Sequence, residues 1–125
     1  MGIRFFLCKH CGNLVGLIQD AGVGMMCCGE KMAELEANTV DASKEKHVPK
    51  IIVSEDTVVV KVGSAPHPMT EAHSIQWIYL ETEKGGQRKN LHAGGPVEAV
   101  FQVIDDVPAA VFAYCNLHGL WKTEL

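Results

Sequence analysis

Long apolar runs and concentrations of positive charge are both missing from this chain of 125 residues. A membrane-spanning helix needs roughly 18–20 consecutive apolar residues, and no stretch of the sequence is that long. The first residues, MGIRFFLCKHCG, have no long apolar segment and no small-residue cleavage site, so no secretory signal is expected. The net charge is −4 and no segment is rich in Lys or Arg. We therefore expect a cytoplasmic protein that binds neither nucleic acid nor membranes.

A sustained helical pattern is also absent, because no apolar stripe with a period of about 3.6 residues continues beyond a turn or two. From Pro49 onward, short segments rich in β-branched and aromatic residues alternate with turn residues, which is typical of strands. Residues 57–62 alternate in this way, and Ile75, Trp77 and Tyr79 are predicted to share one face. ETEKGGQR, at 81–88, predicts a hairpin with a Gly-Gly turn. About seven such strands predict an antiparallel β-sandwich.

The N-terminal part has a different character, with short segments separated by glycines. A unit this small buries too little apolar surface to fold alone and usually needs a metal or disulfides. DASKEK, at 41–46, is polar and is expected to form a loop between two units. We therefore expect a small first domain over residues 1–37 and a sandwich domain over residues 38–125.

Four of the five cysteines lie in the first unit, at Cys8, Cys11, Cys27 and Cys28. Disulfides are rare in the cytoplasm, so this cluster favours a four-thiolate metal site over two disulfides or plain buried cysteines. Zinc and iron both accept such ligands. Adjacent residues of an extended chain point to opposite faces, so the backbone at Cys27–Cys28 must twist. This spacing resembles the desulforedoxin-type, rubredoxin-like iron centre, with His10 left as an exposed loop residue.

A second set of candidate ligands lies at predicted strand ends and loops of the sandwich, where binding sites are usually built. Its members are His47, His67, His73, Cys115 and His118. A straight strand would separate His67 from His73 by roughly 20 Å, but Pro66 and Pro68 argue for a loop. Each histidine alone would be an ordinary polar residue. The spacing allows all five side chains to bind one ion with an open position, which suits iron or copper better than structural zinc. His92 has no partner motif.

Taken together, CKHCGN, CCGE, EKHVP, HPMTEAHSI and CNLHGLW resemble desulfoferrodoxin, the two-iron class of superoxide reductase, over essentially the whole chain. The resemblance implies an all-β protein with a desulforedoxin-like iron domain at 1–37 and an immunoglobulin-like sandwich with the catalytic iron at 38–125. It also implies two iron ions per chain. The first would be bound by Cys8, Cys11, Cys27 and Cys28, and the second by His47, His67, His73 and His118 with Cys115 as axial ligand.

The same resemblance implies an enzyme that reduces superoxide to hydrogen peroxide and thereby serves detoxification and oxidative stress defence. Glu45 would be the sixth ligand of the oxidised second iron, and Lys46 would lie beside its open position. A homodimer that takes electrons from rubredoxin or a similar donor is expected. The alternatives are an iron protein that transfers electrons without catalysis, a superoxide dismutase and a structural zinc module.

Overall fold

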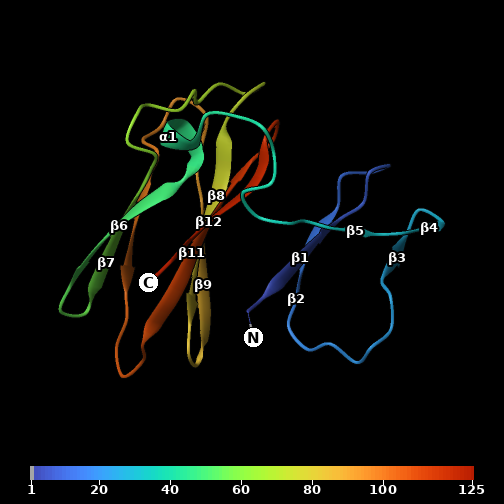
Figure 1. Cartoon of the computed structure of the whole chain (residues 1–125), viewed down its shortest axis with the longest axis horizontal. Coiled ribbons are helices and arrows are strands. Elements are labelled where there is room, and N and C mark those ends of the chain that lie inside the picture. Colours follow the sequence, from blue (N-terminus) through green and yellow to red (C-terminus); the bar gives the residue numbers. More distant parts are fainter. Residues whose placement is uncertain (1) are drawn as a thin grey trace. The chain divides into compact units, whose positions relative to one another are not determined.

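The computed structural model describes residues 2–125, and the chain divides into two compact units (Figure 1). The first runs to Glu36 and the second spans Ala37–Leu125. Strands make up almost all of the regular structure, so the all-β prediction is confirmed. Within the described range, no helix is long and apolar enough to cross a membrane.

The first unit consists of a small antiparallel sheet and a separate hairpin, which lies between the second and third strands of the sheet along the chain. The sheet has the order β2-β1-β5, with β1 (Arg4–Leu7) between β2 (Leu14–Leu17) and β5 (Ala33–Glu34). The hairpin consists of β3 (Met26–Cys27) and β4 (Glu30–Lys31). Its core is small: Phe6, Cys8 and Met32 form a buried cluster, and Val15, Leu17 and Met25 pack against it.

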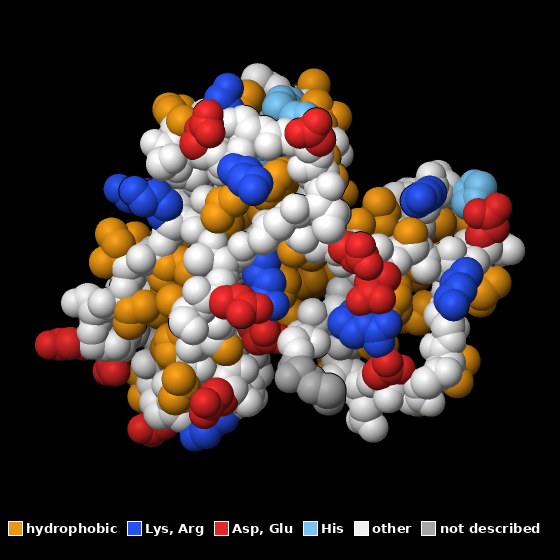
Figure 2. Space-filling model, in the orientation of Figure 1, with side chains coloured by type: hydrophobic (Ala, Val, Ile, Leu, Met, Phe, Trp, Pro, Cys, Tyr) orange, Lys and Arg blue, Asp and Glu red, His pale blue; other side chains and the backbone are white. Residues whose placement is uncertain are grey.

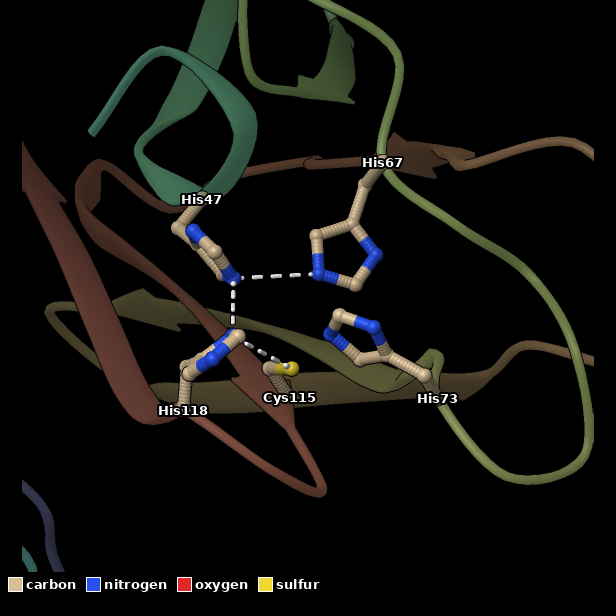
Figure 3. A group of neighbouring side chains, drawn as sticks. All are labelled: His47, His67, His73, Cys115 and His118. Atoms are coloured by element: carbon tan, nitrogen blue, oxygen red, sulfur yellow. Dashed lines mark hydrogen bonds between the residues drawn. The ribbon is translucent and has the colours of Figure 1, made fainter. Parts of the chain in front are cut away.

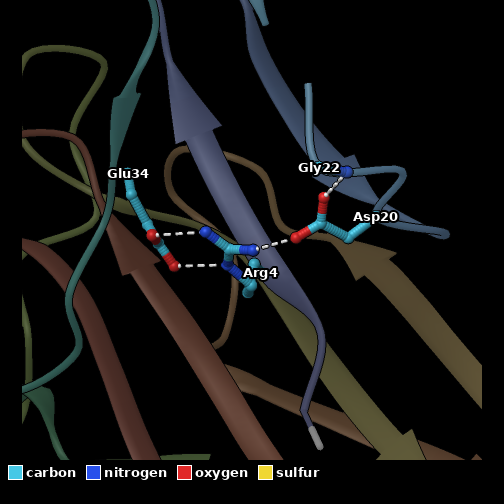
Figure 4. A network of polar contacts seen from close by, with 4 residues as sticks. All are labelled: Arg4, Asp20, Gly22 and Glu34. Carbon is cyan, nitrogen blue, oxygen red and sulfur yellow. Dashed lines mark hydrogen bonds and ion pairs between the residues drawn. The ribbon is translucent and has the colours of Figure 1, made fainter. Parts of the chain in front are cut away.

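An exposed polar network supplements this small core, and its Arg4 guanidinium lies 5.3 Å from the centroid of the Phe6 ring (Figure 4). The Arg4 guanidinium on β1 donates two hydrogen bonds, of 2.8 and 2.9 Å, to the Glu34 carboxylate on β5. Its other edge contacts Asp20 in the loop after β2, and Asp20 in turn accepts the Gly22 N–H at 2.7 Å. Exposed ion pairs of this kind contribute about 1 kcal/mol or less each, so the network mainly fixes the loop to the sheet.

The second unit is a sandwich of seven antiparallel strands in two sheets (Figure 1). One sheet has the order β10-β7-β6, with β6 (Pro49–Ser54), β7 (Thr57–Val62) and β10 (Glu98–Gln102). The other has the order β12-β11-β8-β9, with β8 (Ile75–Thr82), β9 (Gly85–Asn90), β11 (Pro108–Cys115) and β12 (Gly119–Glu124). The buried side chains of both sheets form one cluster, which includes Val60, Phe101, Leu80 and Val111. The predicted sandwich is thus confirmed.

Three local details differ from the sequence predictions. The hairpin over 81–88 forms, but Thr82 pairs with Gly85, so Glu83 and Lys84 make the turn. A Cβ on Gly86 would lie 2.0 Å from the hydroxyl oxygen of Tyr79, so this glycine makes room for the Tyr79 side chain across the strand.

The other two differences bear on the site. Part of the predicted loop 41–46 is helical, because one turn, α1 (Lys44–His47), precedes β6. Ile75 does not share a face with Trp77 and Tyr79, since it packs in the core cluster with Ile78 and Leu80. The cause is a β-bulge, at which the pairing between β11 and β8 shifts register between Tyr114 and Cys115.

Candidate metal centres

The five candidate ligands of the second unit meet at one end of the sandwich (Figure 3). His47 ends α1, His67 and His73 lie on the connection between β7 and β8, Cys115 ends β11, and His118 lies in the turn before β12. One donor atom from each lies within 4.8 Å of all the others. The loop that Pro66 and Pro68 suggested therefore does bring His67 and His73 together.

The arrangement of these donors fits a metal ion. His47 Nε2 lies 3.1 Å from His67 Nε2 and 3.1 Å from His118 Nδ1, and Cys115 Sγ lies 3.9 Å from His118 Nδ1. The Nε2 atom of His73 is buried and has no hydrogen-bond partner among the residues that the structure describes. A buried nitrogen without a partner costs about 1–3 kcal/mol, and metal coordination would remove that cost. Four imidazoles and one thiolate that converge in this way are a donor set suited to iron.

Backbone carbonyls fix which nitrogen of two imidazoles faces the centre. His47 Nδ1 lies 2.6 Å from the carbonyl oxygen of Ser43, and His67 Nδ1 lies 2.6 Å from that of Pro68. A carbonyl only accepts, so each Nδ1 carries the proton and each Nε2 presents its lone pair to the centre. Burial disfavours the imidazolium and lowers the pKa of His47, and it lowers the pKa of His67 to about 4. Both side chains are thus held in the neutral form that a metal requires.

Trp121 supports two ligands that are far apart in sequence. Its fully buried indole stacks on the His47 ring with centroids 4.8 Å apart and an interplanar angle of 23°. The indole N–H donates to the carbonyl oxygen of His118 at 3.1 Å. The sequence alone assigned no role to Trp121. Its place three residues after His118 is visible in the sequence, but its stacking on His47 depends on a contact between distant segments.

Glu45 and Lys46 lie on α1, directly before His47, and both are exposed. The position of this helical turn depends on close backbone packing. The N–H of Ala65 donates to the carbonyl oxygen of Glu45 at 2.8 Å, and a Cβ on Gly63 would lie only 2.3 Å from that same oxygen. Gly63 has a φ of +79°, a conformation that favours glycine. Its role was not predicted, because it depends on contact between segments distant in sequence.

The four cysteines of the first unit also converge, with their sulfur atoms within 4.8 Å of one another. The Sγ atoms of Cys11 and Cys27 are 3.6 Å apart, and those of Cys27 and Cys28 are 3.9 Å apart. A disulfide needs about 2 Å, so neither pair is bonded, and all five cysteines of the chain are free thiols. The disulfide alternative is therefore wrong for this structure.

The predicted twist between the adjacent cysteines is confirmed. Cys28 and Gly29 form the two-residue turn between β3 and β4, and their φ values are +52° and +77°. Positive φ at both central residues is what a type I′ hairpin turn requires. This turn aims Cys28 back toward the group that Cys27 joins.

The charges of these sulfurs show why the group needs a cation. Hydrogen bonding from the backbone N–H of Cys11 lowers the pKa of Cys8 to about 6. Hydrogen bonding with the Cys11 and Cys8 sulfurs raises the pKa of Cys28 to about 12. Four thiolates this close repel one another, so full ionisation requires a metal ion at their centre. His10 stays outside the group, is exposed as predicted, and contacts Glu30 at 2.9 Å.

Comparison with known proteins is consistent with both groups. A model of the Desulfoferrodoxin family matches residues 39–124. A desulfoferrodoxin of Syntrophotalea carbinolica is 46% identical over 122 residues, which cover 98% of this chain and 96% of that protein. The chain belongs to the desulfoferrodoxin family. The family predicted from the motifs is therefore confirmed.

Solved structures extend the comparison. A superoxide reductase from Treponema pallidum is 40% identical and has a TM-score of 0.83, with 99% of this chain and 100% of that chain covered. A superoxide reductase (1Fe-SOR) from Giardia intestinalis is 35% identical with a TM-score of 0.54, and covers 66% of this chain and 100% of its own length. Desulfoferrodoxins carry two iron sites, and the four-cysteine and the four-histidine, one-cysteine groups of this chain correspond to them. Family membership and the two groups of candidate ligands thus confirm the prediction of two iron sites.

Proposed function

We propose that this chain is a superoxide reductase, which reduces superoxide to hydrogen peroxide at the four-histidine, one-cysteine centre. The observation that carries the proposal is the convergence of five donors from His47, His67, His73, Cys115 and His118. Five donors leave one position of a six-coordinate iron free for a small ligand. The structural relatives from Treponema pallidum and Giardia intestinalis are named superoxide reductases, which agrees with this chemistry.

When ferrous iron is bound there, it supplies one electron to superoxide, and two protons complete hydrogen peroxide. The side chains set the charge for this reaction. Four neutral imidazoles and one thiolate leave the ferrous site with a net charge of +1, which favours an incoming anion. The Cys115 thiolate would hold the iron and donate electron density to it, which would favour transfer of an electron to the substrate.

Lys46 is proposed to attract superoxide. The net charge of the chain is −4, and Figure 2 shows cationic and anionic side chains interspersed over the face in view, so the attraction must be local. Lys46 is exposed and directly precedes the buried ligand His47. A cation beside the entrance of a site raises the association rate of an anion by roughly tenfold or more.

Glu45 is proposed as the sixth ligand of the oxidised second iron. It is exposed on the same helical turn, two positions before His47. Its carbonyl is held by the Ala65 N–H, so a change in its side chain position would not require α1 to unfold. A carboxylate is a suitable ligand for ferric iron once the product has left.

The first centre is proposed to store or transfer one electron at an iron bound by Cys8, Cys11, Cys27 and Cys28. In this proposal, residues 1–37 form that iron domain and residues 38–125 form the catalytic sandwich domain. Electrons come from rubredoxin or a similar donor, and the protein is a homodimer. A cytoplasmic location and a role in oxidative stress defence complete the proposal.

Pulses of superoxide given to anaerobically reduced protein test the function. His73→Ala removes a donor of the second group, and Cys28→Ser removes a donor of the first. We expect superoxide to oxidise iron rapidly in the wild type and in Cys28→Ser but not in His73→Ala. Equal loss of the rapid phase in both variants would contradict the assignment of the reaction to the second group alone. No rapid phase in any of the three proteins would favour the alternative, an iron protein that transfers electrons without catalysis.

A further inference from the structure

The turn that carries His73 is hydrogen-bonded to the rest of the sandwich through a single residue, Asn116. Within this turn, Thr70 and His73 bond to each other, since each backbone N–H donates to the carbonyl oxygen of the other residue. The Thr70 hydroxyl also contacts the backbone of His73. These bonds shape the turn but do not attach it to anything. In the part of the chain that the structure describes, the hydrogen bonds found from residues 70–74 to other segments all end on Asn116.

Asn116 bonds to the residues on both sides of His73. Its Oδ1 accepts the N–H of Ser74 at 2.9 Å, and its Nδ2 donates to the carbonyl oxygen of Ala72 at 2.9 Å. Its own backbone N–H donates to the carbonyl oxygen of Ser74 at 3.2 Å. Asn116 directly follows Cys115, so this one residue connects the segment of one ligand to the segment of another.

The position of Asn116 follows from the β-bulge. Tyr114 pairs with Trp77 and Cys115 pairs with Ile75, so the next pair along the ladder would be Asn116 with Ser74. There the Asn116 side chain accepts the Ser74 N–H in place of a backbone carbonyl. Asn side chains commonly replace backbone partners in this way at turns. Because the Asn116 side chain takes the place of a backbone carbonyl, the main chain can turn away toward His118 while the Ser74 N–H keeps a hydrogen-bond acceptor.

We propose that Asn116 is a positioning residue, which clamps the His73 turn to the Cys115 segment and thereby sets how tightly the second centre retains iron. The inference rests on the proposed iron site but not on its reaction with superoxide. Cys115 is fully buried, and the buried Nε2 of His73 has no hydrogen-bond partner within residues 2–125. Side chains that orient metal ligands typically change metal affinity by about 10–100-fold when they are replaced.

Asn38 offers a matched control. Its Nδ2 donates to the carbonyl oxygen of Lys122 at 3.1 Å, and its Oδ1 accepts the Lys122 N–H at 2.9 Å. It lies in the same unit and makes the same two kinds of bond, but to a residue that neither ligates nor flanks a ligand. Asp in place of Asn retains the acceptor in both cases and sets a carboxylate oxygen against a carbonyl oxygen.

The experiment compares the iron-loaded full-length wild type with Asn116→Asp and Asn38→Asp. The first readout is the rate at which a strong ferrous chelator removes iron from the second centre. The second is the energy of the thiolate-to-iron absorption band of the oxidised second centre, which responds to the Cys115–iron contact. We expect release at least tenfold faster for Asn116→Asp with a shifted band, while Asn38→Asp stays within about twofold of the wild type with an unchanged band.

Equal release rates and unchanged bands in the two variants would overturn the proposal. If Asn116→Asp does not fold, Asn116→Ala removes both side-chain bonds without adding a charge, and the same comparison applies. Iron that leaves the Asn116→Ala second centre at the wild-type rate would again overturn the clamp. A wild type whose second centre takes up no iron would instead refute the proposed function, and the clamp would fail with it.

Discussion

Replacing Gly63 by Ala should disturb α1 and the ligand that ends it. The φ of +79° at Gly63 costs a non-glycine residue about 1–2 kcal/mol. The new Cβ would also lie 2.3 Å from the carbonyl oxygen of Glu45 and 2.8 Å from the Lys46 backbone. Backbone atoms cannot rotate away, so α1 must shift, at an overpacking cost of about 1–3 kcal/mol. We expect a total loss of about 2–5 kcal/mol.

Gly94→Ala is the matched control for this prediction. Gly94 lies in the same unit and has a φ of +81°, but a Cβ there meets nothing within 4 Å. Gly94→Ala should therefore lose only about 1–2 kcal/mol, the part that comes from the positive φ. The difference in unfolding free energy between the two variants then isolates the clash with α1. Both tryptophans, Trp77 and Trp121, belong to the second unit, so their fluorescence during urea unfolding of the metal-free protein reports on this unit. If Gly63→Ala is as stable as Gly94→Ala, our account of how α1 is held is wrong.

Three further predictions concern residues around the second centre. Lys46→Met should slow oxidation by superoxide about tenfold in stopped-flow measurements, and higher salt should narrow the difference, because screening weakens local attraction. Trp121→Phe should lower the free energy of unfolding by about 1–3 kcal/mol and speed iron release to a chelator, since the carbonyl of His118 loses its donor. In the metal-free protein, the pKa of His67 is lowered to about 4. The contribution of neutral His67 to the free energy of unfolding should be fully present above about pH 6.5. The free energy of unfolding should fall by roughly 2–3 kcal/mol as the pH drops toward about 4, because His67 binds a proton more readily in the unfolded state.

Each of these predictions has a result that contradicts it. A Lys46→Met variant whose rate and salt dependence match the wild type would remove the role in substrate attraction. Iron release from Trp121→Phe at the wild-type rate would mean that the bond from the indole N–H to the His118 carbonyl does not support the ligand. A flat unfolding free energy between pH 7 and pH 4, measured by urea titration, would show that burial does not hold the His67 imidazole neutral.

The candidate ligands of both centres could be picked out from the sequence because their residue types are conspicuous, and their assignment to two sites came from the resemblance. Closely spaced cysteines in a unit too small to fold alone indicate a metal, and histidines beside prolines indicate loops rather than strands. The strand 57–62 was predictable because apolar residues alternate along it, and the strand 75–82 because it is rich in β-branched and aromatic residues. The convergence of His67 with His73 was only permitted by the sequence, since the path of a loop depends on what it packs against.

The supporting residues could not be predicted, because their roles depend on partners distant in sequence. Gly63 matters through the backbone of α1, and Trp121 matters through its stacking on His47. Asn116 matters through the β-bulge, which also places Ile75 in the core rather than on the face of Trp77. A bulge is a property of two strands together, and periodicity along one strand does not reveal it.

The measurement that tests the central claim most directly is the yield of hydrogen peroxide per superoxide consumed by anaerobically reduced protein in a single turnover. Superoxide reduction at the four-histidine, one-cysteine centre predicts one peroxide for each superoxide, with the iron of that centre oxidised in the same proportion. One peroxide for every two superoxide ions, with the iron unchanged, would mean dismutation and would contradict the proposed function. No consumption of superoxide would leave an electron carrier, and the roles proposed for Glu45 and Lys46 would then be wrong.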